Sequence, residues 1–261
     1  MSVMPVSVAI IAKDEARHIA AAIASVSGRV AEIVVLVDQR STDATATIAA
    51  DAGAIVVIEA WRGFPGQRNL ALSLCTQPWV FFLDADERVE PDLLDELGTV
   101  CTQSPPDVAG YWVPRHNYFF GRCLVGGGWY PDYQLRAVRR REAHFDEQIE
   151  VHEVAAVRGR TEHVQGHLTH LNIERFDELW HKQAAYARRE AATMYQQGRP
   201  VRWRNYVGAP VREFVYRYLT NGGWRDGWVG LVLASVMAWF AMVSFVELRR
   251  LQRASKGTRN D

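Results

Sequence analysis

The sequence predicts an α/β protein in which a mostly parallel central sheet carries helices on both faces. Three observations predict this fold. Short apolar segments alternate with longer amphipathic segments through the first half of the chain, as strands and helices do. Residues 80–83 form a continuous apolar run, which is typical of a strand buried on both faces. Strand-like segments also end in acidic residues, at Asp38 and Asp84, and ligands bind at that edge of open α/β sheets.

The alternation can be followed element by element. Strands are expected over residues 6–12, 32–38, 54–59 and 79–83, and helices over residues 15–26, 44–52 and 64–75. The helix over 44–52 is preceded by the cap-forming residues 41–43 and followed by Gly53. Right-handed crossovers between parallel strands then bring their carboxyl ends to one edge of the sheet.

The second half of the chain changes from strands to helices. Strands are expected over 109–120, 134–138 and 161–171, and helices over 174–197, 210–219 and 228–246. Three consecutive glycines at 126–128 predict a flexible loop between the first two of these strands. We therefore expect one domain over 1–172, with halves 1–100 and 101–172, and a helical region over 173–261.

Composition limits the kind of protein. The net charge is zero, but residues 199–261 contain 11 Lys and Arg against 4 Asp and Glu, about +7, which leaves the preceding body about −7. The three cysteines lack metal-ligand spacing, and the apolar start runs directly into charged residues. These features favour a cytosolic body with reduced thiols and no signal peptide. Neither a G-x-G-x-x-G turn nor a P-loop is present, which argues against dinucleotide binding and P-loop chemistry.

The acidic residues after the buried strand form the first candidate site. Asp84 and Asp86 flank the small Ala85, so in extended chain the two carboxylates point to the same side. Oxygen ligands of this kind suit Mg²⁺ or Mn²⁺ held jointly with substrate phosphates. The alternative is a plain strand end before a helix that starts at Pro91. Asp38 can accept hydrogen bonds from a base or a ribose hydroxyl.

Several motifs in order carry a resemblance. They are the stretches at 8–15, V-D-Q-R-S-T-D-A-T at 37–45, G-x-x-N-x-A-L at 66–72, L-D-A-D-E-R at 83–88, G-W-Y-P-D-Y-Q-L-R-x-x-R-R at 128–140 and V-H-E at 151–153. Together they resemble the family-2 inverting glycosyltransferases of GT-A fold, and within them the lipopolysaccharide-core β-glucosyltransferases. The usual V-D-S-G-S-T-D differs here, because Gln39 and Arg40 replace Ser-Gly.

The resemblance implies a nucleotide-sugar donor, most often a UDP-sugar, bound with Mg²⁺ or Mn²⁺. It implies that Asp38 holds the base or ribose, Asp84 the ribose and the metal, and Asp86 the metal. The residues expected to contact the donor are Ala12, Glu15, Asp38, Arg68, Asn69, Asp84 and Ala85. For Gln67, beside Arg68, a solvated first helical turn is an equal alternative.

An inverting transfer needs one general base for the acceptor hydroxyl. Glu153 matches the glutamate of V-H-E and is the first choice, and Asp132 is the second. Alternatively, these carboxylates only form ion pairs with the arginines at 136, 139 and 140. If those arginines face the cleft, they would instead bind phosphate or an anionic acceptor. His163, His167 and His170 have helical spacing, but a strand over 161–171 would scatter them, so a zinc site is not expected.

The tail contains an almost uncharged run of about 19 residues, 228–246, close to the lower length for crossing a bilayer. Arginines flank it, and the segment 202–218 before it is basic and aromatic. A buried core helix, a spanning helix, and a re-entrant or in-plane helix at the membrane interface all remain open, with the last slightly favoured. Truncation before Arg199 is expected to release a soluble body.

The sequence therefore predicts a membrane-associated, metal-dependent inverting glycosyltransferase. Its acceptor would be a glycolipid or polyprenyl-linked sugar at the cytoplasmic face of a bacterial inner membrane. The alternatives are a sugar-nucleotide pyrophosphorylase-like nucleotidyltransferase and a non-catalytic membrane scaffold of the same fold. A nucleic-acid partner is not expected, and a homo-oligomer is left open.

Overall fold

The computed structural model describes residues 3–148 and 154–257 and divides the chain into two compact units. The first unit contains Met1–His116 and Asp132–His170, and the second contains Asn117–Pro131 and Leu171–Asp261. The second unit begins close to the expected boundary at 172. It also contains residues 117–131, which we assigned from the sequence to the first domain.

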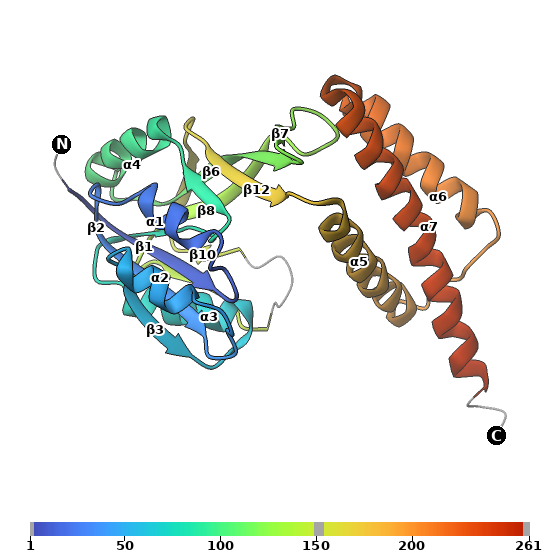
Figure 1. The fold of residues 1–261 in the computed structure, drawn as a ribbon, viewed down its shortest axis with the longest axis horizontal. Helices are drawn as coiled ribbons and strands as arrows, with labels where there is room; N and C mark the ends of the chain where they lie inside the picture. Colours follow the sequence, from blue (N-terminus) through green and yellow to red (C-terminus); the bar gives the residue numbers. More distant parts are fainter. Residues whose placement is uncertain (1–2, 149–153, 258–261) are drawn as a thin grey trace. The chain divides into compact units, whose positions relative to one another are not determined.

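A large mixed sheet forms the centre of the first unit (Figure 1). Four strands are parallel and follow the order β3 (Ile55–Glu59), β2 (Val30–Asp38), β1 (Met4–Ala12) and β4 (Trp79–Phe82). The sheet then continues through β8 (Asp132–Arg139), β6 (Val108–Phe119), β12 (Leu168–Ile173) and β5 (Glu87–Val89). The β4–β8, β8–β6 and β12–β5 pairs are antiparallel, so only half of the sheet is parallel as expected.

The change to antiparallel pairing has a local cause. No helix lies between β6 and β8, and a parallel pair would need a long crossover there. The strand expected over 161–171 is divided into β11 (Arg160–His163), which pairs with β6, and β12. Three further short strands are β7 (Arg122–Cys123), also on β6, and the pair β9 (Ala143–His144) and β10 (Ala156–Val157).

Helices cover both faces of this sheet. On one face α1 (Ile19–Ala24), α2 (Thr45–Asp51) and α4 (Pro91–Gln103) pack on alternate residues of the central strands, such as Ile10 and Phe81. On the other face α3 (Gly63–Leu74) packs on the intervening residues, such as Leu36 and Phe82. All four residues of β4 are buried, as its apolar sequence predicted.

The second unit is helical. It contains α5 (Phe176–Gln196), α6 (Asn205–Phe214), the π-helical turn η1 (Val215–Thr220), the 3₁₀ turn η2 (Gly223–Asp226) and α7 (Gly227–Gly257). Both α5 and α6 run along α7 (Figure 1). The apolar side of α7 packs on Leu179 and Ala187 near the start of α5, and on Ala191 and Met194 near its end. The long apolar helix predicted over 228–246 is present and extends to Gly257.

The glycine loop at 126–128 is held in place, which differs from the flexible loop expected. The buried carboxylate of Asp226 accepts hydrogen bonds from the backbone N–H groups of Val125 and Gly126, at 2.8 and 3.0 Å. A Cβ atom at Gly126 would lie 2.2 Å from the carbonyl oxygen of Gly222. Glycine is needed here because the two backbones touch, so this loop is part of the second unit's packed core.

Candidate active site

The loops after β1 and β2 are joined to each other at the carboxyl edge of the sheet. Asp14, in a left-handed conformation with φ of 55°, accepts a hydrogen bond from the backbone N–H of Thr42 at 2.7 Å. The backbone N–H of Glu15 donates to the hydroxyl of Thr45 at 2.8 Å. These bonds explain why the helix expected from residue 15 begins only at Ile19. They fix Ala12 and Glu15 beside the end of β2.

Asp38 ends β2, and its carboxylate is occupied by Arg40. The side chain of Asp38 is 1% exposed, and the Arg40 guanidinium donates from Nε at 3.1 Å to each oxygen and from Nη2 at 2.6 Å. These hydrogen bonds are the main reason why the pKa of Asp38 is lowered to about 2. The residue that replaces the family's glycine therefore covers the carboxylate expected to hold the base or ribose.

The acidic motif follows β4 in a tight turn. The backbone N–H of Glu87 donates to the carbonyl oxygen of Asp84 at 3.0 Å, and Ala85 is buried within the turn. The carboxylate of Asp84 pairs with Arg136 and lies 3.6 Å from Nη2 of Arg68. Loss of hydration by itself raises the pKa of Asp84, but these two guanidinium groups outweigh it and hold that pKa far below its ordinary value.

A ladder of alternating charges leads from Asp84 to Asp132. Oε1 of the fully buried Glu87 accepts hydrogen bonds from Arg136 at 2.6 Å and from Arg115 at 3.0 Å. Arg115 in turn donates to Oδ2 of Asp132 at 2.5 and 3.0 Å. Sequence reasoning missed Arg115 and gave Glu87 no role. Glu87 lies inside the L-D-A-D-E-R motif, whereas nothing in the sequence marks Arg115.

A second acidic group gathers around Asp86. Burial is the main reason why the pKa of Glu15 is raised to about 7, and the negative charges of Asp86, Asp43 and Asp84 raise it further. His170, from β12, places Nε2 at 3.3 Å from Oδ2 of Asp86. His170 received no role from the sequence, although its resemblance to a histidine of the family was a signal.

The other two histidines of that segment have different partners, since His163 ends β11 and His167 lies between β11 and β12. His163 stacks on Trp112, with ring centroids 6.2 Å apart. His167 stacks on His116 at 4.0 Å. Of the three, His170 lies beside an acidic residue of the motif, Asp86.

Helix α3 contributes three polar residues with different surroundings. Arg68 reaches Asp84 and lies over the rings of Phe82 and Phe145, 5.5 and 5.8 Å from their centroids. The amide of Asn69 holds the backbone of Phe145 with two hydrogen bonds of 2.8 and 2.9 Å. Gln67 is fully buried, so a solvated first turn is wrong for it, and its amide has no hydrogen-bond partner among the residues described.

Of the two candidate bases, the structure describes the surroundings of Asp132 alone. Glu153 lies outside the described residues. Both carboxylate oxygens of Asp132 are occupied, Oδ2 by Arg115 and Oδ1 by the amide of Gln134 at 2.8 Å. Asp132 thus forms an ion pair, as the alternative in the sequence analysis supposed, but its partner is Arg115 and not one of the arginines at 136, 139 and 140. The arginines at 139 and 140 donate to backbone carbonyl groups instead of pairing with it.

Comparison with known proteins identifies the family. Residues 7–162, more than half of the chain, match the model of glycosyl transferase family 2. The chain belongs to this family. The matched range contains most of β1, all of β2 to β4, the acidic turn and the Asp84–Asp132 ladder, so these features belong to a glycosyltransferase domain. This confirms that the protein is a glycosyltransferase.

Relatives extend the similarity of this family-2 glycosyltransferase beyond the matched domain. It is 32% identical over 256 residues to the lipopolysaccharide core biosynthesis glycosyltransferase LpsC of Rhizobium meliloti, covering 94% of this chain and 92% of LpsC. An uncharacterized glycosyltransferase of Rickettsia felis is 46% identical over 92 residues, which are 35% of this chain and 32% of that protein. The helical unit is therefore within the region shared with LpsC.

A solved structure supports the fold. The mannosyltransferase PcManGT of Pyrobaculum calidifontis, solved with GDP-mannose and Mn²⁺, superposes with a TM-score of 0.53 at 13% identity. The superposition covers 95% of this chain and 89% of that chain. At this identity the likeness bears on the fold alone, and it confirms the GT-A-like α/β architecture predicted from the sequence.

Proposed function

We propose that this protein is a metal-dependent inverting glycosyltransferase that uses a UDP-sugar. Its proposed acceptor is a glycolipid or polyprenyl-linked sugar of the bacterial cell envelope, reached at the cytoplasmic face of the inner membrane. The observation that carries the proposal is the acidic group at the carboxyl edge of the sheet, where Glu15, Asp84 and Asp86 repel one another and His170 adjoins Asp86.

The residues at this edge fit a divalent cation shared with a diphosphate. Asp86 and His170 would hold it, because their donor atoms are already within 3.3 Å of each other. Among residues 3–148 and 154–257 no three acidic, histidine or cysteine side chains form a complete cage. A partial donor set is what Mg²⁺ and Mn²⁺ use when substrate phosphates complete the coordination. When bound, the cation would neutralise the negative charge that develops on the departing diphosphate.

The chain's own residues would orient the rest of the donor. Arg136 and Arg68 fix the Asp84 carboxylate, which keeps 39% of its surface exposed and can accept a hydrogen bond from a ribose hydroxyl. Asp38 can accept from the base only if Arg40 turns away, and the Arg40 side chain is free to do so because it is 56% exposed.

The attacking hydroxyl needs a base on the face opposite the leaving group. We propose Glu153 for this role, with Asp132 as a positioning residue. Arg115 and Gln134 donate to the two oxygens of Asp132 and so hold its carboxylate in a fixed orientation. Since Arg115 also reaches Glu87, the ladder ties Asp132 rigidly to the acidic turn.

The acceptor class rests on LpsC, whose name assigns it to lipopolysaccharide core synthesis and which aligns over nearly the whole chain. Cores of that kind are built on a lipid, so a membrane-borne acceptor fits the apolar helix of the second unit. The sugar donor named for PcManGT carries a different nucleotide, so the base is best tested directly.

The proposal can be tested with purified protein, UDP- and GDP-sugars, and lipopolysaccharide core acceptors extracted from bacterial membranes. We expect sugar transfer and UDP release that require Mn²⁺ or Mg²⁺, with inversion at the anomeric carbon seen by NMR. Asp86→Asn should lower the rate by at least about 10³-fold. Asp51→Asn, an exposed acidic residue on α2, is the matched control. Full activity in excess EDTA would refute the metal, and release of UTP on addition of pyrophosphate would indicate a nucleotidyltransferase instead.

A further inference from the structure

One side of α7 presents large apolar side chains to the outside. Trp228, Leu231, Trp239 and Val246 are 63%, 44%, 49% and 42% exposed. Their spacing of three, eight and seven residues places them on a single side of an α-helix. The sequence contains no Asp, Glu, Lys or Arg from Gly227 to Val246. We call these four residues the α7 stripe.

The opposite side of α7 is packed inside the second unit. Half of its most apolar 18-residue window is buried there. The buried hydroxyl of Ser244 donates to a carboxylate oxygen of Glu190, on α5, at 2.6 Å. On α5 the neighbouring Arg188 and Arg189 are exposed. If α7 crossed a bilayer with these contacts intact, it would carry those charges into the hydrocarbon, which is strongly unfavourable.

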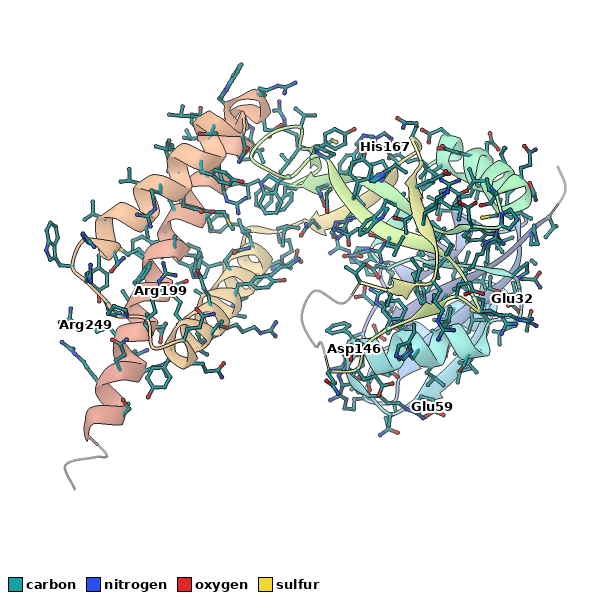
Figure 2. The ribbon with its side chains drawn as sticks, turned by 180° about the vertical axis from the view of Figure 1, so that it is seen from behind. Glu32, Glu59, Asp146, His167, Arg199 and Arg249 are labelled. Carbon is teal, nitrogen blue, oxygen red and sulfur yellow. The ribbon has the colours of Figure 1, made fainter. Side chains whose placement is uncertain are left out.

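Basic residues at both ends of the uncharged run indicate what covers the α7 stripe. Arg225 precedes the uncharged run, and Arg249, Arg250 and Arg253 follow it, all exposed. Arg199 and Arg249 lie on the same helical unit (Figure 2). Residues 199–261 carry 11 basic against 4 acidic residues. Two copies joined through the stripe would bring these positive charges together, whereas anionic lipid headgroups would neutralise them. Two of the four stripe residues are tryptophan, which favours the boundary between lipid and water.

Helix α6 and the turn η1 repeat the pattern. Apolar residues four apart are exposed just before and along them, namely Trp203, Val207, Val211, Val215 and Leu219. Arg202 and Arg204 stand beside the first of these, and both are exposed. A second helix with an outward apolar ridge and arginines at its start makes an accidental exposure of the α7 stripe a poor explanation.

We propose that α7 lies in the plane of an anionic lipid surface and does not cross it. The stripe enters the boundary between headgroups and acyl chains, and Arg225, Arg249 and Arg250 contact lipid phosphates. The inference deepens the membrane association in the proposed function by naming the contact surface. It does not depend on the donor, the metal or the acceptor.

The docking surface is tested by flotation of the full-length protein with phosphatidylcholine vesicles, with and without phosphatidylglycerol. We expect binding to the anionic vesicles, weakened by about tenfold or more when Trp228→Ser and Trp239→Ser are combined. Arg225→Gln, Arg249→Gln and Arg250→Gln should each weaken it by about fivefold, and only on anionic vesicles. Tyr186→Ser, which removes a 51% exposed aromatic residue from α5, is the matched control and should bind as the parent does.

Orientation is tested with tags at both ends of the chain, in sealed vesicles to which the protein was added from outside. A helix in the plane leaves both tags open to protease. Protection of the C-terminal tag alone would show a spanning helix and overturn the proposal. So would equal binding by the tryptophan double variant, or a lipid-free dimer that this variant dissociates. Sugar-nucleotide turnover with a soluble acceptor is read separately, so loss of the proposed function and loss of lipid binding are distinguishable.

Discussion

The two units of this glycosyltransferase place charge and apolar surface in opposite ways. In the first unit the charged ladder from Asp84 to Asp132 is centred on Glu87, which has no exposed surface. In the second unit the ionic residues of α5 stay outside, and the apolar side chains of the α7 stripe are exposed with them. Charged residues are usually exposed and large apolar residues usually buried, so both arrangements are unusual and call for an explanation.

This difference between the two units indicates which kind of ligand suits each of them. A largely buried set of paired charges costs free energy to desolvate, so it is kept where rigid positioning of ionic side chains is useful. An exposed apolar stripe costs free energy in water and is kept where another apolar phase covers it. The first unit accordingly suits the charged substrate, and the second the lipid surface, that we propose for them. Four experiments, from the largest effect to the smallest, test this contrast.

Truncation before Arg199 tests whether the first unit and α5 are independent of the rest. The cut would remove α6 and α7 and expose the apolar residues Leu179, Ala187 and Met194 of α5. We expect aggregated protein by size-exclusion chromatography, rather than the soluble body expected from the sequence. Removal of residues 258–261 alone is the control and should leave soluble protein. A monodisperse product from the larger truncation would show that α5 folds without α7.

Substitution of the two candidate bases separates chemistry from positioning. Glu153→Gln should lower turnover by about 10²–10⁴-fold with donor affinity unchanged. Asp132→Asn should have a smaller effect, because its oxygens are already held by Arg115 and Gln134. Turnover is measured from UDP release and donor affinity by calorimetry. If Asp132→Asn gives the larger loss, the two roles are reversed.

Glu87→Gln tests the buried ladder itself. Removing its charge leaves Arg136 and Arg115 close together with one fewer partner, so the free energy of unfolding should fall by about 3 kcal/mol. Glu59→Gln is the matched control, because its ion pair with Arg62 is at the surface and should change stability by less than about 1 kcal/mol. Urea unfolding followed by circular dichroism gives both values. Equal losses would mean that the ladder does not stabilise the fold.

Glu15→Gln tests the acidic edge in metal-free protein. The pKa of Glu15 is about 7 in the fold against an ordinary 4.5, so the folded chain keeps a proton that the unfolded chain releases. Stability should therefore fall as the pH rises from 4.5 to about 7, by roughly 2 kcal/mol, and Glu15→Gln should remove that fall. Thermal unfolding at a series of pH values measures it, with Glu59→Gln as control. Parallel curves for parent and variant would show that the pKa of Glu15 is not raised in the fold.

The sequence by itself determined the local elements and the position of the acidic edge. Apolar runs of strand length end at Asp38 and just before Asp84, and their burial in β2 and β4 follows from composition alone. The long apolar helix was equally plain, because the absence of charge over about 19 residues is visible without a structure. Periodicity reports which residues are apolar and how far apart they lie along one element.

Only the tertiary structure decided which polar groups meet and which apolar surface is covered. Arg136 and Asp84 are 52 residues apart in the chain, yet they form an ion pair. Likewise β12 places His170, the last residue of the first unit in sequence, beside Asp86. Arg115 gives no local signal, since an arginine in a strand looks the same whether it faces water or Glu87. The sequence likewise left open whether α7 fills a core, spans a bilayer or lies at the membrane interface, with a slight preference for the last. Packing against α5 and α6 covers one side of α7 and leaves the other exposed, because burial depends on neighbouring elements that a single helix does not contain.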